Sequence, residues 1–189
     1  MAASPREPVY RPSDDTFLLA DVVAGYGGAV ALEMGVGSGY VTAELARRVW
    51  VAVGTDIDLA AVRETRDRLR RSGLANVDLV CCDLASPFRD RPFDLVVFNP
   101  PYLPSRRRDD AAVDGGRRGI EAALAFLKHA LRVVKESGRL LFVASTLSDY
   151  RGILRLLGER GFGSRVVGAR RLFFEEIVVI EASPWGGPM

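Results

Sequence analysis

The sequence predicts an α/β fold built on a mostly parallel, seven-stranded sheet with helices on both faces. Short apolar runs, which are typical of buried strands, alternate with amphipathic patterns, which are typical of helices. Repeated strand–helix units favour parallel strands joined by right-handed crossovers. The last two apolar runs have no helical pattern between them, which predicts an antiparallel C-terminal hairpin strand.

The first elements follow from a capping signal and from apolar runs. Residues 13–25 begin with Ser13, a favourable N-cap residue, and continue with an acidic first turn, which predicts a helix. The apolar run 29–35 predicts a buried strand, the pattern of 39–49 a helix, and the run 50–57 a second strand. Together they form the first parallel unit of the sheet.

The second crossover helix is predicted over 58–73. Leu59, Val62 and Leu69 fall on one side of this helix and are candidates for the core. Gly73 is the residue type that most often follows the end of a helix, because it adopts positive φ without strain. The helix is therefore expected to stop there.

The middle of the chain is predicted to continue with further strands and helices. Apolar runs predict the third and fourth strands over 77–84 and 93–99. A long amphipathic helix is predicted over 119–138, a fifth strand over 139–145 and another helix over 146–161. The second, third and fifth strands thus each follow a predicted helix.

The C-terminal runs 165–174 and 175–182 lie close enough in sequence to pair with each other. No repeat or long linker divides the chain, so residues 1–189 are expected to form a single domain. Residues 1–12 are then an N-terminal extension. Residues 103–118 form a loop above the expected site, where loops commonly carry specificity.

Composition narrows the class of protein. Hydrophobic residues make up 48% and charged residues 26% of the chain, and the net charge is only +2, which does not favour a strong nucleic-acid binder. Residues 1–12 carry charges and prolines where a signal peptide has an apolar block. Cys81 and Cys82 are expected to be reduced residues in or near the core. These features predict a cytoplasmic protein.

A glycine-rich turn follows the first predicted strand in the segment "LEMGVGSGY". Gly35, Gly37 and Gly39 allow positive φ and a close approach of the backbone to a ligand. The spacing differs from the G-x-G-x-x-G that seats a pyrophosphate, and the carboxylate of Glu33 would repel a phosphate. A carboxylate there suits a ligand with an ammonium group.

Two more acidic residues end the next two predicted strands. Asp56 lies about 20 residues beyond the glycines, where a carboxylate accepts hydrogen bonds from ribose hydroxyls. Asp83 is placed to accept from an adenine amine, with Leu84 against the ring. Each residue alone suits a loop or a helix cap, but together they predict a nucleoside with an amino-acid tail, S-adenosylmethionine.

The fourth predicted strand runs into Asn99, Pro100, Pro101 and Tyr102. Proline lacks an N–H group, so this corner offers hydrogen-bond acceptors: the Asn99 side-chain oxygen and a proline carbonyl. Two acceptors can hold both hydrogens of a planar –NH2 group, and Tyr102 offers an aromatic face to stack on it. The corner predicts methyl transfer to an amide or amino nitrogen, without a metal. The one histidine, His129, is expected to be structural.

The motifs together resemble the HemK/PrmC family, in its short eukaryotic and archaeal branch. The resemblance rests on "VYRPSDDTFLLAD", "LEMGVGSGY", "TDID", "CDL", "FNPPYLP" and "DGGRRGIEAALAFL". It implies a Rossmann-like class I S-adenosylmethionine-dependent methyltransferase. The implied reaction methylates the side-chain amide nitrogen of glutamine in the Gly-Gly-Gln motif of a class-1 translation release factor.

The resemblance also implies roles for individual residues. The implied cofactor contacts are Thr16, Glu33, Gly35, Gly37, Asp56, Asp83, Leu84 and Asn99. The implied substrate contacts are Asn99, Pro100, Pro101, Tyr102 and Leu103, with Asn99, Pro100 and Tyr102 as the catalytic corner.

The chain departs from the family in two places. The bacterial branch carries an N-terminal helical substrate domain, whereas only about a dozen residues precede the first predicted helix here, so we expect substrate to be recognised elsewhere. Asp58 stands where relatives often have Asn, a change we expect to be tolerated.

Alternatives remain open for partner and substrate. The third strand is expected at a sheet edge, where relatives of the short branch bind a small zinc-ribbon activator. The loop also carries three consecutive arginines, Arg106, Arg107 and Arg108. They could face an acidic partner surface or a phosphate backbone, or they could simply be a solvated run of charges. The same Asn-Pro-Pro-Tyr corner serves adenine N6-methyltransferases acting on DNA or RNA, and a cofactor-binding scaffold without activity is a third reading.

Overall fold

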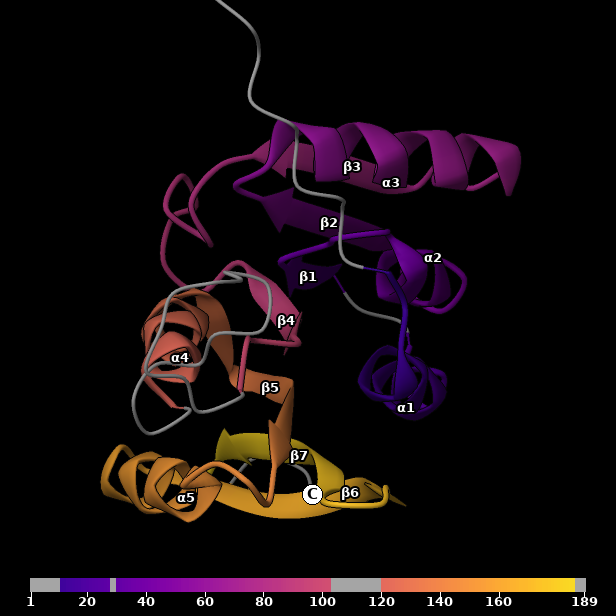
Figure 1. Cartoon of the computed structure of the whole chain (residues 1–189). Helices are drawn as coiled ribbons and strands as arrows, with labels where there is room; N and C mark the ends of the chain where they lie inside the picture. Colours follow the sequence, from indigo (N-terminus) through magenta and orange to yellow (C-terminus); the bar gives the residue numbers. More distant parts are fainter. Residues whose placement is uncertain (1–10, 28–29, 103–119, 186–189) are drawn as a thin grey trace, which may run out of the picture.

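The computed structural model describes residues 11–27, 30–102 and 120–185 (Figure 1). The helices are α1 (Asp14–Val23), α2 (Tyr40–Ala46), α3 (Leu59–Arg71), α4 (Glu121–Val133) and α5 (Tyr150–Glu159). The strands are β1 (Val30–Met34), β2 (Val51–Asp56), β3 (Val77–Cys81), β4 (Phe93–Phe98), β5 (Val134–Ser145), β6 (Phe162–Arg171) and β7 (Glu176–Pro184). Each predicted element therefore has a counterpart.

The seven strands form one sheet in the order β3-β2-β1-β4-β5-β7-β6. Strands β1 to β5 pair in parallel, and β7 is antiparallel to both β5 and β6. The predicted fold class and the antiparallel C-terminal strand are confirmed. The third strand lies at an edge of the sheet, as expected.

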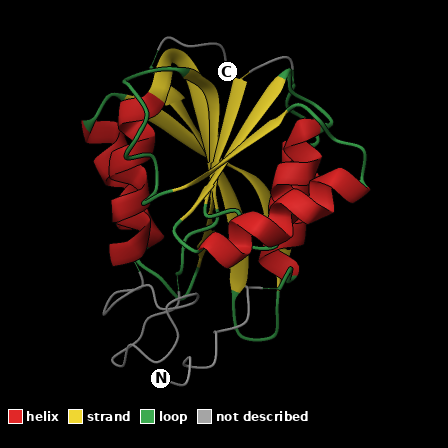
Figure 2. Ribbon diagram, turned by 90° about the horizontal axis from the view of Figure 1, so that it is seen from above, coloured by secondary structure: helices red, strands yellow, loops and turns green. Residues whose placement is uncertain are grey.

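Helices cover both faces of the sheet (Figure 2). Helices α1 and α2 bury Leu19, Val23 and Leu45 against one face, and α4 and α5 bury Leu127 and Leu157 against the other. Helix α3 packs beside α2, over β2 and β3. Since both faces of the central strands are covered, these strands read as continuous apolar runs rather than alternating ones.

The boundary between α4 and β5 differs from the prediction. Helix α4 ends at Val133 rather than at residue 138, and β5 begins at Val134. Val134 pairs with Phe93 of β4, and the register shifts before Leu95. A Cβ atom on Gly138 would lie 2.9 Å from the carbonyl oxygen of Asp94, so glycine permits this close pairing. Strand pairing overrides the helical pattern here.

Three smaller predictions, on the burial of two residues and on one helix cap, were wrong. Leu59 is 47% exposed, because it is the first residue of α3 and projects beyond the sheet. Cys81 is exposed and Cys82 half-buried, because β3 is an edge strand; both are free thiols. The side chain of Ser13 does not cap α1 but donates to Asp15.

The end of α3 follows the prediction. Gly73 adopts φ +68°, and Leu74 N donates to the carbonyl oxygen of Leu69 at 3.0 Å. This is the pattern by which a glycine in the left-handed conformation closes a helix.

Two predicted segments lie wholly or mostly outside the residues that the structure describes. The loop 103–118, with Leu103 and Arg106 to Arg108, and most of the extension 1–12 lie outside the described residues. Within the described ranges, no helix combines the length and apolar character needed to span a bilayer.

Candidate functional site

The carboxyl ends of the central strands bring the predicted site residues to one rim of the sheet. Met34 pairs with Thr55 on one side and with Phe98 on the other. The residues that follow or end these three strands, Gly35, Asp56 and Asn99, are therefore neighbours across the sheet. Open parallel sheets bind ligands at this rim, where the strand order reverses.

Asp56 fixes the glycine turn. Gly37 N donates to Asp56 Oδ2 at 3.0 Å, and Asp58 N donates to Asp56 Oδ1 at 2.9 Å. Each carboxylate oxygen keeps a further lone pair that can accept from a ligand hydroxyl. Asp56 is half-buried at the rim, so such a ligand can reach it.

The turn itself needs glycine at two positions for different reasons. Gly35 has φ +79°, which L side chains rarely adopt. Gly39 has φ +74°, and a Cβ atom there would lie 2.6 Å from Thr65 Oγ1 of α3. The turn therefore packs tightly against α3 while its backbone faces the rim.

Glu33 is a buried carboxyl group beneath this turn. Its side chain is 4% exposed and accepts a hydrogen bond from the hydroxyl of Thr42. Its pKa is raised to about 8, mainly by burial; the Thr42 hydrogen bond opposes this rise and the nearby charge of Asp56 adds to it. A cationic group arriving at the rim would favour its ionised form.

Glu33→Gln should therefore change how stability depends on pH. Folding raises the pKa of Glu33 from 4.5, so the wild-type free energy of unfolding falls as pH rises through about 8. Gln carries no titrating proton. Relative to wild type, the free energy of unfolding of the variant should rise by on the order of 4 kcal/mol between about pH 5 and about pH 9, measured by urea unfolding. A stability difference that does not change with pH would contradict the buried protonated carboxyl.

The predicted adenine contacts lie one strand further along the rim. Cys82 N donates to the carbonyl oxygen of Asp56 at 2.9 Å, which ties the segment after β3 to the end of β2. Asp83 is exposed. Leu84 is half-buried against the core beneath α4 and has φ +47°, a strained value for leucine. Such strain is common at ligand sites.

Asn99 provides an acceptor with no protein partner. Its Oδ1 atom is buried and receives no hydrogen bond from the described part of the chain. Pro100 beside it is buried, and Pro101 and Tyr102 are half-buried. A buried acceptor is costly to leave unpaired, so this atom is suited to a ligand's N–H group.

Asp15 is a residue of the site that sequence reasoning missed. It is 3% exposed, and its carboxylate accepts from Thr16 N at 2.7 Å, from Thr16 Oγ1 at 3.3 Å and from the hydroxyl of Tyr102 at 3.2 Å. It thus joins the first turn of α1 to the Asn-Pro-Pro-Tyr corner. In the sequence, Asp15 reads only as part of an acidic first turn.

Aromatic rings surround the glycine turn on both faces of the sheet. Phe17 of α1 packs edge-on against Tyr40 of α2, with centroids 5.1 Å apart. Phe126 of α4 stacks on Phe98 at 5.7 Å and lies close to Gly35. The amphipathic patterns gave no sign that these rings would meet at the rim. Thr16 lies beside Phe17, so α1 brings this predicted residue to the same region.

Tyr102→Phe tests the link between α1 and the corner. It removes only the hydroxyl that donates to Asp15 and leaves the ring, so kcat should fall about three- to tenfold with little change in cofactor affinity. Rate assays and calorimetry measure the two effects separately. Tyr26→Phe is the matched control, since Tyr26 donates to Glu181, outside this corner. Equal rates for Tyr102→Phe and wild type would show that the link does not position the corner.

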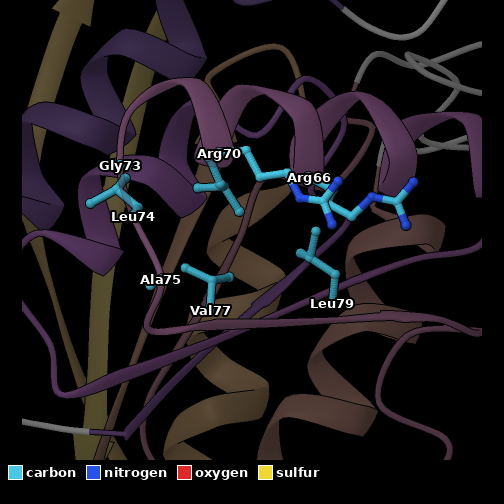
Figure 3. Close-up of a pocket in the computed structure, with 8 residues that line it drawn as sticks. Arg66, Arg70, Gly73, Leu74, Ala75, Val77 and Leu79 are labelled. Atoms are coloured by element: carbon cyan, nitrogen blue, oxygen red, sulfur yellow. The ribbon is translucent and has the colours of Figure 1, made fainter.

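A separate hollow of about 500 Å³ lies between α3 and β3 (Figure 3). Leu69, Leu74, Val77 and Leu79 form its apolar walls, and Arg66 and Arg70 of α3 border it. It runs beside the open edge of the sheet rather than at the rim that carries Asn99.

The comparisons agree with this geometry. Residues 14–166 match the family described as "Methyltransferase small domain". A putative protein N5-glutamine methyltransferase of Methanocaldococcus jannaschii is 28% identical over 181 residues, which cover 92% of this chain and 91% of the relative. The methyltransferase HEMK2 of Mus musculus is 30% identical over 192 residues, covering 93% and 89%.

A solved structure is similar over nearly its whole length. It is the E. cuniculi Mtq2–Trm112 complex, described as responsible for methylation of the eRF1 translation termination factor. The matching chain is 29% identical with a TM-score of 0.79, and the match covers 94% of this chain and 99% of that one.

Proposed function

Because this chain belongs to the methyltransferase small domain family, in its HemK/PrmC group, and is an S-adenosylmethionine-dependent enzyme, we propose that it methylates the side-chain amide of a glutamine in a translation release factor. The observation that carries the proposal is the buried Oδ1 of Asn99, which lies at the rim before two prolines and accepts no hydrogen bond from the residues that the structure describes. The full-length likeness to protein N5-glutamine methyltransferases supports glutamine as the acceptor.

The corner acts by positioning. An amide nitrogen is a weak nucleophile, because its lone pair is delocalised into the carbonyl group. Asn99 Oδ1 and the carbonyl of Pro100 accept its two hydrogens, and the ring of Tyr102 packs against the flat amide. The corner thereby orients the nitrogen toward the cofactor side of the rim. Asp15 holds the hydroxyl of Tyr102 and keeps the corner in place.

The other rim residues hold the cofactor, which supplies an electrophilic methyl group when bound. Asp56 accepts from the ribose hydroxyls and Glu33 pairs with the ammonium group. Asp83 and Leu84 hold the adenine ring, while Gly35, Gly37 and Thr16 line the remaining wall. The buried carboxyl of Glu33, the acceptors of Asp56 and the unpartnered Asn99 fit this ligand.

A labelling experiment tests the proposal. The purified chain is mixed with methyl-labelled S-adenosylmethionine and the class-1 release factor of the same organism, and the modified residue is mapped by mass spectrometry. Label should enter the glutamine of the Gly-Gly-Gln motif. A release factor whose Gln is replaced by Glu is the matched control. Label that enters adenine of added DNA or RNA instead would support the alternative N6-methyltransferase activity.

We also propose that a small partner protein, of the zinc-ribbon type that the resemblance implies, docks along β3. Strand β3 pairs only with β2 among the described strands, so its outer edge is available for pairing. The apolar hollow bordered by Arg66 and Arg70 lies along this edge, as Figure 3 shows, and would take an apolar side chain flanked by acidic groups. The Mtq2–Trm112 complex supports such an assembly.

Arg70→Glu should weaken this complex about tenfold, because it places a like charge against the acidic flank of the partner. Arg71→Glu is the matched control: Arg71 is the next residue of α3, is equally exposed and does not line the hollow. Affinity for a purified Trm112-type protein is measured by calorimetry. Similar losses for both variants would place the interface elsewhere.

A further inference from the structure

Two phenylalanines at the tip of the β6–β7 hairpin are almost fully exposed. Phe173 is 92% and Phe174 84% exposed, and their rings pack edge-on with centroids 4.7 Å apart. Neither ring belongs to a core cluster, and neither is among the predicted cofactor contacts. Adjacent exposed aromatic rings are unfavourable in water and often mark a surface that another molecule covers.

The hairpin tip is held in place. Leu172 N donates to the carbonyl oxygen of Glu175 at 2.8 Å, which closes the turn. Glu176 N donates to Thr146 Oγ1 at 2.9 Å, and Thr146 N donates to the carbonyl oxygen of Glu176 at 3.0 Å. Glu175 also accepts from the hydroxyl of Ser145. The rings therefore stand on a fixed support, which lowers the entropy cost of binding.

The tip lies on the same rim of the sheet as Asn99. Phe98, the last residue of β4, pairs with Phe142 of β5, and Ser145 at the end of β5 pairs with Ile177 of β7. Figure 1 shows β4, β5, β7 and β6 side by side in this order. Two to three strand spacings, roughly 10–15 Å, separate Asn99 from the hairpin sideways across the sheet. Ser145 lies two residues beyond the level of Asn99, so the tip also stands about 7 Å or more further out along the strand direction.

Contacts connect the hairpin to the catalytic corner. Arg170 at the end of β6 forms an ion pair with Asp14 of α1 at 3.0 Å. The next residue, Asp15, accepts from Tyr102. The end of β6, the start of α1 and the Asn-Pro-Pro-Tyr corner are thus linked by direct contacts.

We propose that Phe173 and Phe174 bind an apolar surface of the protein substrate outside the segment that carries the reacting glutamine. This inference rests on the proposed function. The segment 170–176 has two arginines and two glutamates, so the tip is neutral, and it suits a protein surface better than a phosphate backbone. A glutamine inserted at Asn99 would bring the surrounding substrate surface to within roughly 20 Å of the tip, a distance that a folded protein substrate spans.

The test compares two substrates for one variant. Phe173→Ser/Phe174→Ser is assayed with the intact release factor and with a short synthetic Gly-Gly-Gln peptide that cannot reach the tip. kcat/KM for the intact factor should fall about tenfold or more, mainly through KM, while that for the peptide stays within twofold of wild type. Cofactor affinity and the urea midpoint should not change.

Trp50→Ala is the matched control, because Trp50 is 74% exposed but precedes β2, at the opposite rim. It should leave both substrates unaffected. An unchanged kcat/KM of the double variant for the intact factor would overturn the inference alone, and so would equal losses for both substrates. Light scattering that shows a wild-type dimer and a monomeric double variant would assign the tip to a second copy of the chain and overturn it as well. Wild-type protein that methylates neither substrate would refute the proposed function and this inference together.

Discussion

Asn99→Ala should lower kcat about 1000-fold, close to a complete loss of methyl transfer, while the fold stays intact. The side-chain oxygen accepts no hydrogen bond from the described residues, so its removal leaves no donor among them without an acceptor. What it removes is the acceptor that orients the amide nitrogen. Because that interaction is needed in the transition state, the loss should appear in kcat rather than in cofactor affinity.

Single-turnover rates measure this effect, and calorimetry with S-adenosylhomocysteine measures cofactor affinity, which we expect to change by less than about fivefold. Asn99→Asp is the matched control, since it has the same shape and keeps an acceptor oxygen. Its rate should lie between those of the alanine variant and wild type. Turnover at the wild-type rate by Asn99→Ala would exclude the proposed role of the corner.

Asp56→Ala should weaken binding of S-adenosylmethionine about 100-fold. Two effects add up: the ribose hydroxyls lose a charged acceptor, and the N–H groups of Gly37 and Asp58 lose their hydrogen-bond partner. The glycine turn is then less well ordered before the cofactor binds. Calorimetric titration of both proteins measures the loss.

Asp58→Ala provides the control for Asp56. Asp58 is also acidic and only two residues away, but its side chain caps α3 by accepting from Ala60 N at 2.8 Å. Its removal should cost about 1 kcal/mol of stability and leave cofactor affinity nearly unchanged. If Asp56→Ala behaved like Asp58→Ala, the ribose contact would have to be assigned to another residue.

Much of the candidate site could be predicted from the sequence, because its residues lie at or directly after the ends of strands. The glycines after β1, Asp56 at the end of β2 and Asn99 after β4 are each adjacent to a buried apolar run, and parallel strands necessarily bring their carboxyl ends together. The place of β3 at the edge was expected from the fold class, and the structure confirms it. Residue 103 and the loop after it were also predicted from the sequence, and they lie outside the described residues.

Contacts between distant segments were not predictable in this way. Asp15 and Tyr102 are 87 positions apart, and nothing in either local pattern indicates that a carboxylate of α1 accepts from the catalytic corner. Likewise, a hydrophobic pattern does not show which aromatic residues stay outside the core, as Phe173 and Phe174 do.

The sequence by itself determined the order of strands and helices, the polar residues at the strand ends and the chemistry they suit. Only the tertiary structure decided where α4 ends and β5 begins, that Glu33 is buried deeply enough to hold a proton near neutral pH, and that α1 contacts the Asn-Pro-Pro-Tyr corner. The physical reason is the range of the forces involved. Periodicity and backbone preferences act over a few residues, whereas burial and side-chain pairing depend on segments that meet only when the sheet closes.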